Sequence, residues 1–171
     1  IPKVDVPIFY TKDINNRSTL HFLSSQNIDF LIIYSCGFIS KSICEKFHRK
    51  IVTAHAGKLP EYRGVNNVEW AYFENNDLYG TIQFTEEFMD VGDIAFQKKL
   101  KKVPHPTTIK EIRNDAFQQT FELFPKAIQN CLVEGKLPQK QNTKSRTNVY
   151  VMHPFLKFIL SEYLKEKTNC V

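Results

Sequence analysis

Phe30-Leu31-Ile32-Ile33-Tyr34 is an unbroken run of apolar and aromatic residues that directly follows Asp29. The run shows no alternation of apolar and polar residues, which is typical of a strand buried on both faces, as in a parallel sheet. A second buried strand is predicted over residues 50–54, and two further strands over residues 79–85 and 94–100. Predicted helical segments lie between the first and second of these strands and between the second and third. This alternation predicts an α/β domain with a mostly parallel sheet.

Helices are predicted over residues 19–26, 40–47 and 66–75 from the spacing of their apolar residues. Thr108 and Glu111 form a capping-box pattern at the start of a long helix that runs toward Gly135. A proline within a helix removes a hydrogen bond, so Pro125 should bend this helix or end it early. A last amphipathic helix is predicted over residues 154–165. The side chains expected to face the core from the third and last helices are Trp70, Tyr72 and Phe73, and Phe155, Phe158, Ile159 and Tyr163.

The composition is that of an ordinary globular protein. Hydrophobic residues make up 42% and charged residues 24%, which argues against a disordered tail. No apolar run is long enough for a membrane span, so we expect a soluble cytoplasmic protein without a membrane partner. The formal charge of +5 is spread along the chain, and nucleic-acid binding is not expected. The four cysteines lack the spacing of a zinc site, so no metal is expected.

Two segments carry residues suited to chemistry. The first is Thr53-Ala54-His55-Ala56-Gly57-Lys58-Leu59-Pro60-Glu61-Tyr62-Arg63-Gly64, and the second is Gly80-Thr81-Ile82-Gln83-Phe84 followed by Met89-Asp90-Val91-Gly92-Asp93-Ile94. Both lie at the end of a predicted strand, where open α/β sheets bind their ligands. Imidazole titrates near neutrality and a carboxylate can orient it, so His55 and Asp90 form a candidate proton-transfer pair.

These two segments together resemble the formyltransferases that use 10-formyltetrahydrofolate. The first motif of that family, Asn-x-His followed by Leu-Pro-x-Tyr-Arg-Gly, is matched by Thr53-Ala54-His55 and by residues 59–64. The second, Asp-x-Gly-Asp-Ile, is matched by Asp90-Val91-Gly92-Asp93-Ile94. The resemblance covers roughly residues 6–102. It implies a Rossmann-like fold whose mostly parallel sheet is flanked by helices.

The resemblance also implies roles for individual residues. His55 and Asp90 would be catalytic, together with Thr53, which stands where the family has its catalytic Asn. Arg63 and Gly64 are candidates for contact with the substrate, although a role in shaping the loop is favoured for both. The residues that would enclose the folate are Gly37, Phe38, Ile39, Ser40, Gln83, Thr85, Phe88 and Met89. Gln83 replaces a His that is common in the family.

The domain organisation follows from the same comparison. Residues 1–148 are expected to form the catalytic domain, and residues 149–171 a helical extension that packs on it. The first strands of the family fold have no counterpart in the chain, which opens on Ile1 without an initiator Met. We therefore expect a fragment or a processed chain.

The resulting prediction is transfer of a formyl group from 10-formyltetrahydrofolate to a primary amine. A small-molecule amine is favoured, and an amino-sugar nucleotide is one candidate. Two alternatives stay open. One is hydrolysis of 10-formyltetrahydrofolate, with water as the nucleophile. The other is a non-catalytic relative that binds folate or a partner protein, because Thr offers one hydroxyl donor where the family Asn offers two N–H donors.

Overall fold

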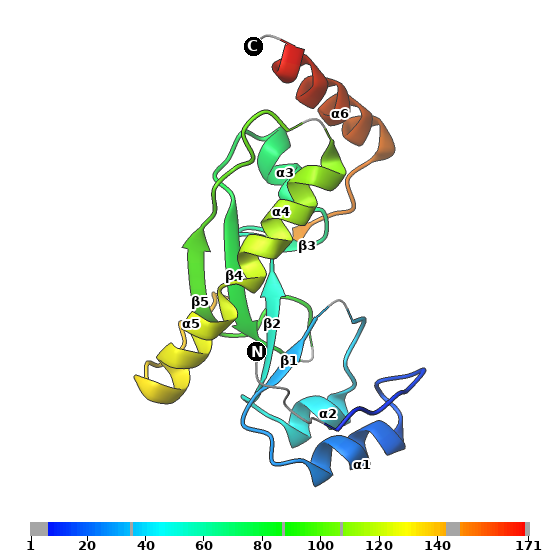
Figure 1. Ribbon diagram of the computed structural model, residues 1–171, viewed down its shortest axis with the longest axis vertical. Helices are drawn as coiled ribbons and strands as arrows, with labels where there is room; N and C mark the ends of the chain where they lie inside the picture. Colours follow the sequence, from blue (N-terminus) through cyan, green and yellow to red (C-terminus); the bar gives the residue numbers. More distant parts are fainter. Residues whose placement is uncertain (1–6, 35, 87, 107, 143–147, 170–171) are drawn as a thin grey trace.

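The computed structural model describes residues 7–34, 36–86, 88–106, 108–142 and 148–169 (Figure 1). Helices are arranged around a four-stranded sheet, with α4 lying across it and α6 at the opposite end of the molecule from α1 and α2. In the described residues a second sheet contains two strands, β3 and β6, which pair in parallel. The elements are α1 (Arg17–Ser25), β1 (Leu31–Ile33), α2 (Lys41–Lys46), β2 (Ile51–His55), β3 (Arg63–Gly64), α3 (Asn67–Phe73), β4 (Tyr79–Phe84), β5 (Ile94–Lys99), α4 (Ile109–Phe121), α5 (Phe124–Ile128), the π-helix η1 (Gln129–Val133), β6 (Asn148–Val149) and α6 (Pro154–Asn169).

The main sheet has the order β1-β2-β4-β5. Only β1 and β2 are parallel, whereas β2 pairs with β4, and β4 with β5, in antiparallel fashion. The prediction of a mostly parallel sheet was therefore wrong, and the sheet is mixed. The short connection over residues 85–93 lets β5 return beside β4 only in the antiparallel sense, because a parallel return needs a longer crossover.

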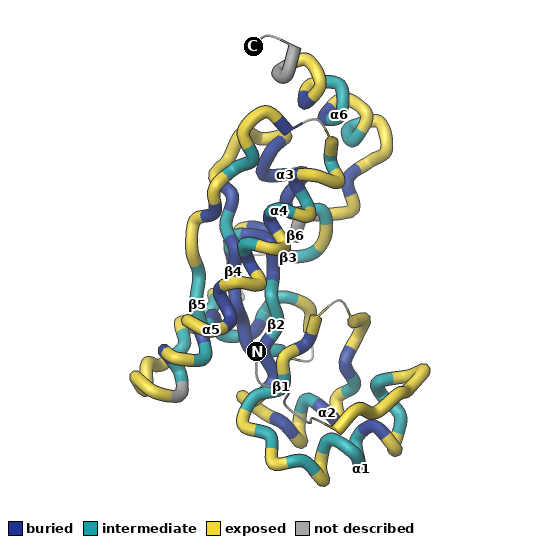
Figure 2. The backbone as a smooth tube through the Cα atoms, viewed as in Figure 1, coloured by how far each residue is buried: buried dark blue, intermediate teal, exposed yellow. Residues whose placement is uncertain are grey.

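Strand β2 lies between two apolar clusters, one on each face of the sheet. Ile51 packs with Ile43 and Phe47 of the α2 region on one face of the sheet. Val52 packs on the other face in a cluster that contains Ile112 of α4. Successive residues of a strand point to opposite faces, so this pair buries β2 from both sides, as predicted. Figure 2 shows the buried path along β2 and β4.

The prediction for the first strand was only half right. Ile33 is buried, but Ile32 is 43% exposed and Tyr34 is exposed as well. Among the described residues β1 has one neighbour in the sheet, so it is an edge strand with less cover than β2. An apolar run alone does not distinguish an edge strand from a central one.

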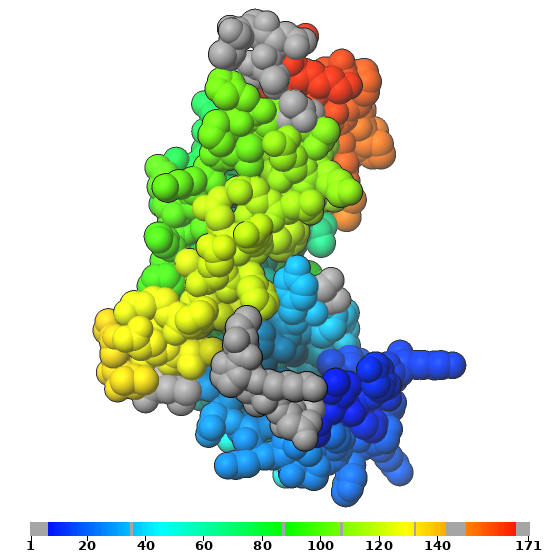
Figure 3. Space-filling view, viewed as in Figure 1, coloured from blue at the N-terminus to red at the C-terminus, as the bar shows by residue number. Residues whose placement is uncertain are grey.

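The long helix is interrupted where proline predicts it. Thr108 caps α4, since its Oγ1 accepts a hydrogen bond of 3.1 Å from the backbone N–H of Glu111. The α4 helix ends at Phe121, and Pro125 lies in the first turn of α5, where the missing N–H is tolerated. In Figure 3, α4 is yellow-green and runs along the visible face between α6 and the N-terminal helices.

Helix α6 presents a different face to the core from the one predicted. Leu160 and Leu164 are each 1% exposed and belong to the main apolar cluster. Four residues of α6 that were expected to face the core are exposed instead: Phe155, Phe158, Ile159 and Tyr163. Phe73 of α3, which was also expected in the core, is exposed as well. Two leucines spaced four apart are enough to anchor α6 against α3 and α4. Within the described ranges, the model contains no helix with the length and apolarity that a membrane crossing requires.

Candidate active site

The pairing of β2 with β4 brings the two sequence motifs together. Thr53 lies opposite Gln83, and His55 lies opposite Thr81. Directly opposed residues of antiparallel strands share a face, as do residues two apart in one strand. These four side chains therefore project from the same face of the sheet, although the two strands are separated by α3 in the chain.

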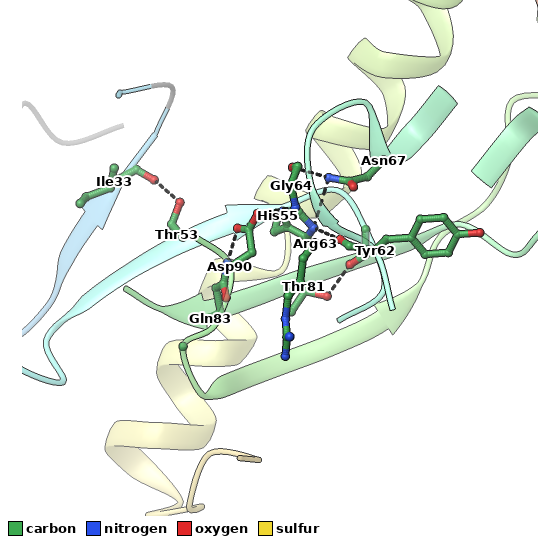
Figure 4. A network of polar contacts seen from close by, with 12 residues as sticks. Ile33, Thr53, His55, Tyr62, Arg63, Gly64, Asn67, Thr81, Gln83 and Asp90 are labelled. Atoms are coloured by element: carbon green, nitrogen blue, oxygen red, sulfur yellow. Dashed lines mark hydrogen bonds and ion pairs between the residues drawn. The ribbon is translucent and has the colours of Figure 1, made fainter. Parts of the chain in front are cut away.

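His55 and Asp90 face each other at the centre of this face (Figure 4). His55 Nδ1 lies 3.3 Å from Asp90 Oδ1, and the two side chains are only 7% and 11% exposed. Asp90 comes from the segment after β4 and has a φ of 55°, in the left-handed region that Asp tolerates better than most residues. This backbone conformation directs the carboxylate toward His55.

Two further donors hold the Asp90 carboxylate. The backbone N–H of Gly64 donates to Oδ2 at 2.9 Å, and Gln83 Nε2 donates to Oδ1 at 2.7 Å. Burial alone would raise the pKa of Asp90. The hydrogen bond and charge of His55, together with the Gly64 and Gln83 donors, outweigh burial and lower that pKa below its ordinary value. Asp90 is therefore an ionised acceptor at neutral pH.

Both nitrogens of His55 face acceptors. While Nδ1 faces Asp90, Nε2 lies 2.6 Å from the carbonyl oxygen of Tyr62. A carbonyl oxygen can only accept, so this short contact requires a proton on Nε2. Gly57 leaves room for this arrangement, because a Cβ there would lie 2.8 Å from Nε2.

Arg63 is placed away from this pair. It is 3% exposed and its side chain points in the opposite direction from Asn67 (Figure 4). Its guanidinium donates to Gln141 Oε1 at 2.9 and 3.2 Å and to the carbonyl of Asn142 at 3.1 Å. These contacts attach Arg63 to residues 141–142, and its loop-shaping role stays a prediction.

Gln141 was not singled out from the sequence. Its Nε2 donates to Gly92 O at 2.6 Å and to Gln83 Oε1 at 3.3 Å, while its oxygen accepts from Arg63. Gln141 therefore joins the first motif to the second behind Asp90. It lies in a polar segment without periodicity, and no sequence signal would have identified it.

One cavity of about 220 Å³ gathers most of the residues predicted to bind folate. Thr53 and Asp90 also line it, and the hydroxyl of Thr53 donates to Ile33 O at 3.3 Å. Ser40 does not line this cavity; it is the N-cap residue of α2, and its N–H donates to Asn15 Oδ1 at 2.7 Å. The predicted residues that line the cavity are Gly37, Phe38, Ile39, Gln83, Thr85, Phe88 and Met89.

A second cavity of about 470 Å³ lies between α3 and α4. His55 and Gly64 line it, and Met89 and Asp90 line both cavities. The two cavities therefore adjoin at Asp90. Residues of this cavity that the sequence did not single out are Asn66, Asn67, Glu69, Arg113 and Phe117. Within the described part of the chain, no three His, Cys, Asp or Glu side chains are grouped so that they could hold a metal ion.

Solved structures share this fold. A formyltransferase, PseJ from Anoxybacillus kamchatkensis, in complex with UDP-4,6-dideoxy-4-formamido-L-AltNAc and tetrahydrofolate, matches 78% of the chain and 69% of its own length, with a TM-score of 0.63 and 21% identity. Methionyl-tRNA formyltransferase from Clostridium thermocellum matches 85% of the chain and 60% of its own length, with a TM-score of 0.63 and 22% identity. At these identities the likeness concerns the fold alone.

Sequence comparison gives the family. Methionyl-tRNA formyltransferase from Clostridium tetani is 32% identical over 130 residues, which are 74% of the chain and 41% of that protein. Phosphoribosylglycinamide formyltransferase from Haemophilus influenzae is 25% identical over 142 residues, which are 79% of the chain and 66% of that protein. The chain thus spans about two fifths of the first relative. The family model described as "Formyl transferase" matches residues 7–128, so the chain belongs to the formyl transferase family.

Proposed function

We propose that this chain transfers a formyl group from 10-formyltetrahydrofolate to a primary amine. The observation that carries the proposal is the position of the His55–Asp90 pair, where two cavities of different character adjoin. A two-substrate transfer needs such an arrangement, because donor and acceptor must meet at the same acid–base pair. Membership of the formyl transferase family supports this choice of reaction.

The smaller cavity has the features that a folate head group requires. Phe38, Phe88 and Met89 are exposed apolar side chains that can cover a flat heterocycle. Thr85 lines the same cavity, and its buried Oγ1 has no hydrogen-bond partner among the described residues, so it can pair with a polar edge of the ring. When bound there, the folate supplies the formyl group. A relative of the same fold was solved with tetrahydrofolate.

His55 is suited to stabilise negative charge on the formyl oxygen. Its Nε2 proton is held by the neutral carbonyl of Tyr62, which is a weaker acceptor than a developing oxyanion. The ring can therefore transfer that hydrogen bond to the reacting oxygen. Asp90 faces the other ring nitrogen, and its ionised carboxylate can accept a proton from the attacking amine. The proton can then pass to the folate nitrogen as the bond between that nitrogen and the formyl carbon breaks, which releases tetrahydrofolate and the formylated amine.

Thr53 adds a single donor to this site. Its hydroxyl donates a long hydrogen bond of 3.3 Å to Ile33 O. Because this bond is long, rotation about one side-chain bond would turn the hydroxyl toward the smaller cavity. One hydroxyl in place of a carboxamide weakens oxyanion stabilisation, and loss of one such donor typically lowers turnover by about 10²–10³. We therefore expect a slow enzyme.

The acceptor is proposed to be a small molecule. A volume of about 470 Å³ for the larger cavity falls in the range of small-molecule sites. The relatives act by name on methionyl-tRNA and phosphoribosylglycinamide, and one was solved with a formamido-sugar nucleotide. An amino-sugar nucleotide is the candidate that we would assay first.

The test is formyl release from 10-formyltetrahydrofolate by the full-length protein that contains this chain, with a panel of amines. His55→Ala removes the proposed catalytic group, and His48→Ala, an exposed histidine outside both cavities, is the matched control. Release that requires an amine, survives His48→Ala and vanishes in His55→Ala supports the transferase. Release without any amine identifies the hydrolase. Folate binding without release leaves the non-catalytic binding protein.

A further inference from the structure

Helix α6 has an apolar stripe on the side that faces away from the core. Leu160 and Leu164 anchor the helix to the core from one side. Phe155, Phe158 and Ile159 are spaced three and four residues apart, so they share a stripe on the opposite side. These three side chains are 62%, 60% and 40% exposed, and α6 lies at one end of the molecule (Figure 1). Apolar residues on both sides of a helix are typical of a helix that is buried on both sides.

The segment that leads into α6 extends this apolar surface. Tyr150 and Val151 are 78% and 70% exposed. The backbone around them is held in place, because Trp70 Nε1 donates to Tyr150 O at 2.8 Å and the N–H of Met152 donates to Asn66 Oδ1 at 3.0 Å. A partner would therefore meet a surface whose backbone is already ordered, which lowers the entropic cost of binding.

Five exposed apolar side chains thus fall within ten consecutive residues, and we call them the α6 face: Tyr150, Val151, Phe155, Phe158 and Ile159. At these exposed fractions the three rings offer about 120–160 Å² each, and the whole α6 face about 500–600 Å². That is the upper end of the apolar patches that monomeric proteins expose. A standard interface buries about 800 Å² on each partner, and homodimer interfaces are about 65% apolar. The α6 face therefore supplies the apolar area that one such interface needs.

The charges around the α6 face favour a protein partner over a membrane surface. Glu162 and Lys165 form an ion pair of 2.7 Å in the turns that follow Ile159, and Glu166 is exposed beside them. Helices that lie on anionic membranes have a polar face rich in Lys and Arg, whereas acidic and basic residues are mixed here. A mixed polar rim beside an apolar centre is typical of an interface between proteins.

The α6 face is also complementary to itself. A two-fold axis that crosses α6 near Phe158 would bring two helices together in antiparallel orientation and place this ring against the same ring of a second copy. Phe155 and Ile159 lie on either side of Phe158 in the stripe, so each would then pack on an apolar residue of the other copy. Such self-complementarity is what a two-fold interface requires.

We propose that the α6 face is a homodimer interface, in which two copies of this chain pack their α6 helices antiparallel about a two-fold axis near Phe158. Dimerisation buries the stripe that the core leaves exposed. The inference goes beyond the proposed formyl transfer and does not depend on it, since neither the α6 face nor its partner contributes to the two cavities at Asp90.

Sedimentation velocity of the full-length protein that contains this chain tests the interface. Between about 1 and 100 µM we expect a dimer, since interfaces of this size bind with micromolar or higher affinity. Phe158→Glu and Phe158→Lys each place two like charges across the axis, and each should weaken the dimer by at least about 100-fold. In an equal mixture of the two variants the charges are opposite, so a heterodimer should form again.

Leu137→Glu is the matched control. This residue follows η1, lies outside the α6 face and is 91% exposed, so the same introduced charge should leave the dimer intact. Thermal unfolding followed by circular dichroism checks that each variant is folded. If Phe158→Glu does not fold, the milder Phe155→Ser on the same stripe takes its place and should also weaken the dimer.

Three outcomes would overturn the inference. The first is a protein that stays monomeric up to about 100 µM, well above the Kd of a standard interface. The second is a dimer that Phe158→Glu and Phe155→Ser leave unchanged, or variants that do not recover when they are mixed. The third is a monomer that co-sediments with vesicles of phosphatidylcholine and phosphatidylserine, which would assign the α6 face to a membrane surface.

Discussion

Gln83 Nε2 lies 2.7 Å from Asp90 Oδ1, so a side chain on β4 orients the carboxylate that faces His55. Gln83 stands one residue before the end of β4, and Gln141 in turn contacts its oxygen. This amide cannot titrate, and it keeps one donor on Asp90 at every pH. Asp90 is thereby held by a positioning residue that does not itself titrate.

Replacing Gln83 tests this role. Gln83→Leu removes a donor that favours the ionised carboxylate, so the pKa of Asp90 should rise. We expect formyl transfer to fall roughly 10- to 100-fold, and the acid limb of the kcat/KM pH profile to move to higher pH. The same change at the exposed Gln118 of α4 is the control. A pH profile that does not move would show that Gln83 only supports the fold.

Replacing Thr53 tests the oxyanion donor. Thr53→Asn supplies two N–H donors on a longer side chain, and we expect formyl transfer to accelerate by about 10- to 100-fold, as measured by single-turnover kinetics. Thr53→Val has no donor and should be no faster than the natural protein. An Asn variant that folds and binds folate without any gain in rate would argue that lost donors do not limit turnover.

The Asp90 carboxylate should also make stability depend on pH. Its pKa is lower in the folded protein than the ordinary value of 3.8, so its interactions contribute fully above 3.8 and are lost as the pH falls through the folded pKa. Urea unfolding measured from about pH 7 down to about pH 3, where carboxylates titrate, should show this loss as a fall in the free energy of unfolding. Asp90→Asn should make the curve flatter below 3.8. Parallel curves for both proteins would contradict the assignment.

Gly92 is predicted to be irreplaceable. A Cβ at this position would lie 1.7 Å from the carbonyl oxygen of Phe84, so the backbone must move. Gly92→Ala should destabilise the protein by about 3 kcal/mol and displace Asp90, two residues away. Gly37→Ala has nothing within 4 Å of its Cβ, and its effect should stay within about 0.5 kcal/mol. Equal unfolding midpoints for the two variants would refute this prediction.

The elements that the sequence predicted well are those with dense apolar patterns. Ile51 and Val52 predicted a strand buried on both faces, and the structure confirms it. The direction of β4 was not predictable in the same way, because apolar content is the same for parallel and antiparallel strands. The connection between β2 and β4 contains α3, as a parallel crossover would, yet His55 pairs with Thr81 in antiparallel fashion.

The candidate site was predictable only where a motif marked it. His55 and Asp90 stand in two short motifs, and the fold brings them within 3.3 Å. Gln141 stands outside any motif, and its role arises from contacts across the fold. Its side chain meets Gln83 from 58 positions away in the chain. Such contacts leave no local pattern in the residues around them.

Asp90 and Met89 line both cavities, and this shared boundary has a thermodynamic consequence. A ligand in either cavity displaces water from one side of the same carboxylate and changes the field that the other ligand meets. The two binding free energies are therefore coupled. By linkage, whatever factor a ligand in one cavity exerts on the affinity of the other cavity for its ligand, that second ligand exerts in equal measure on the first.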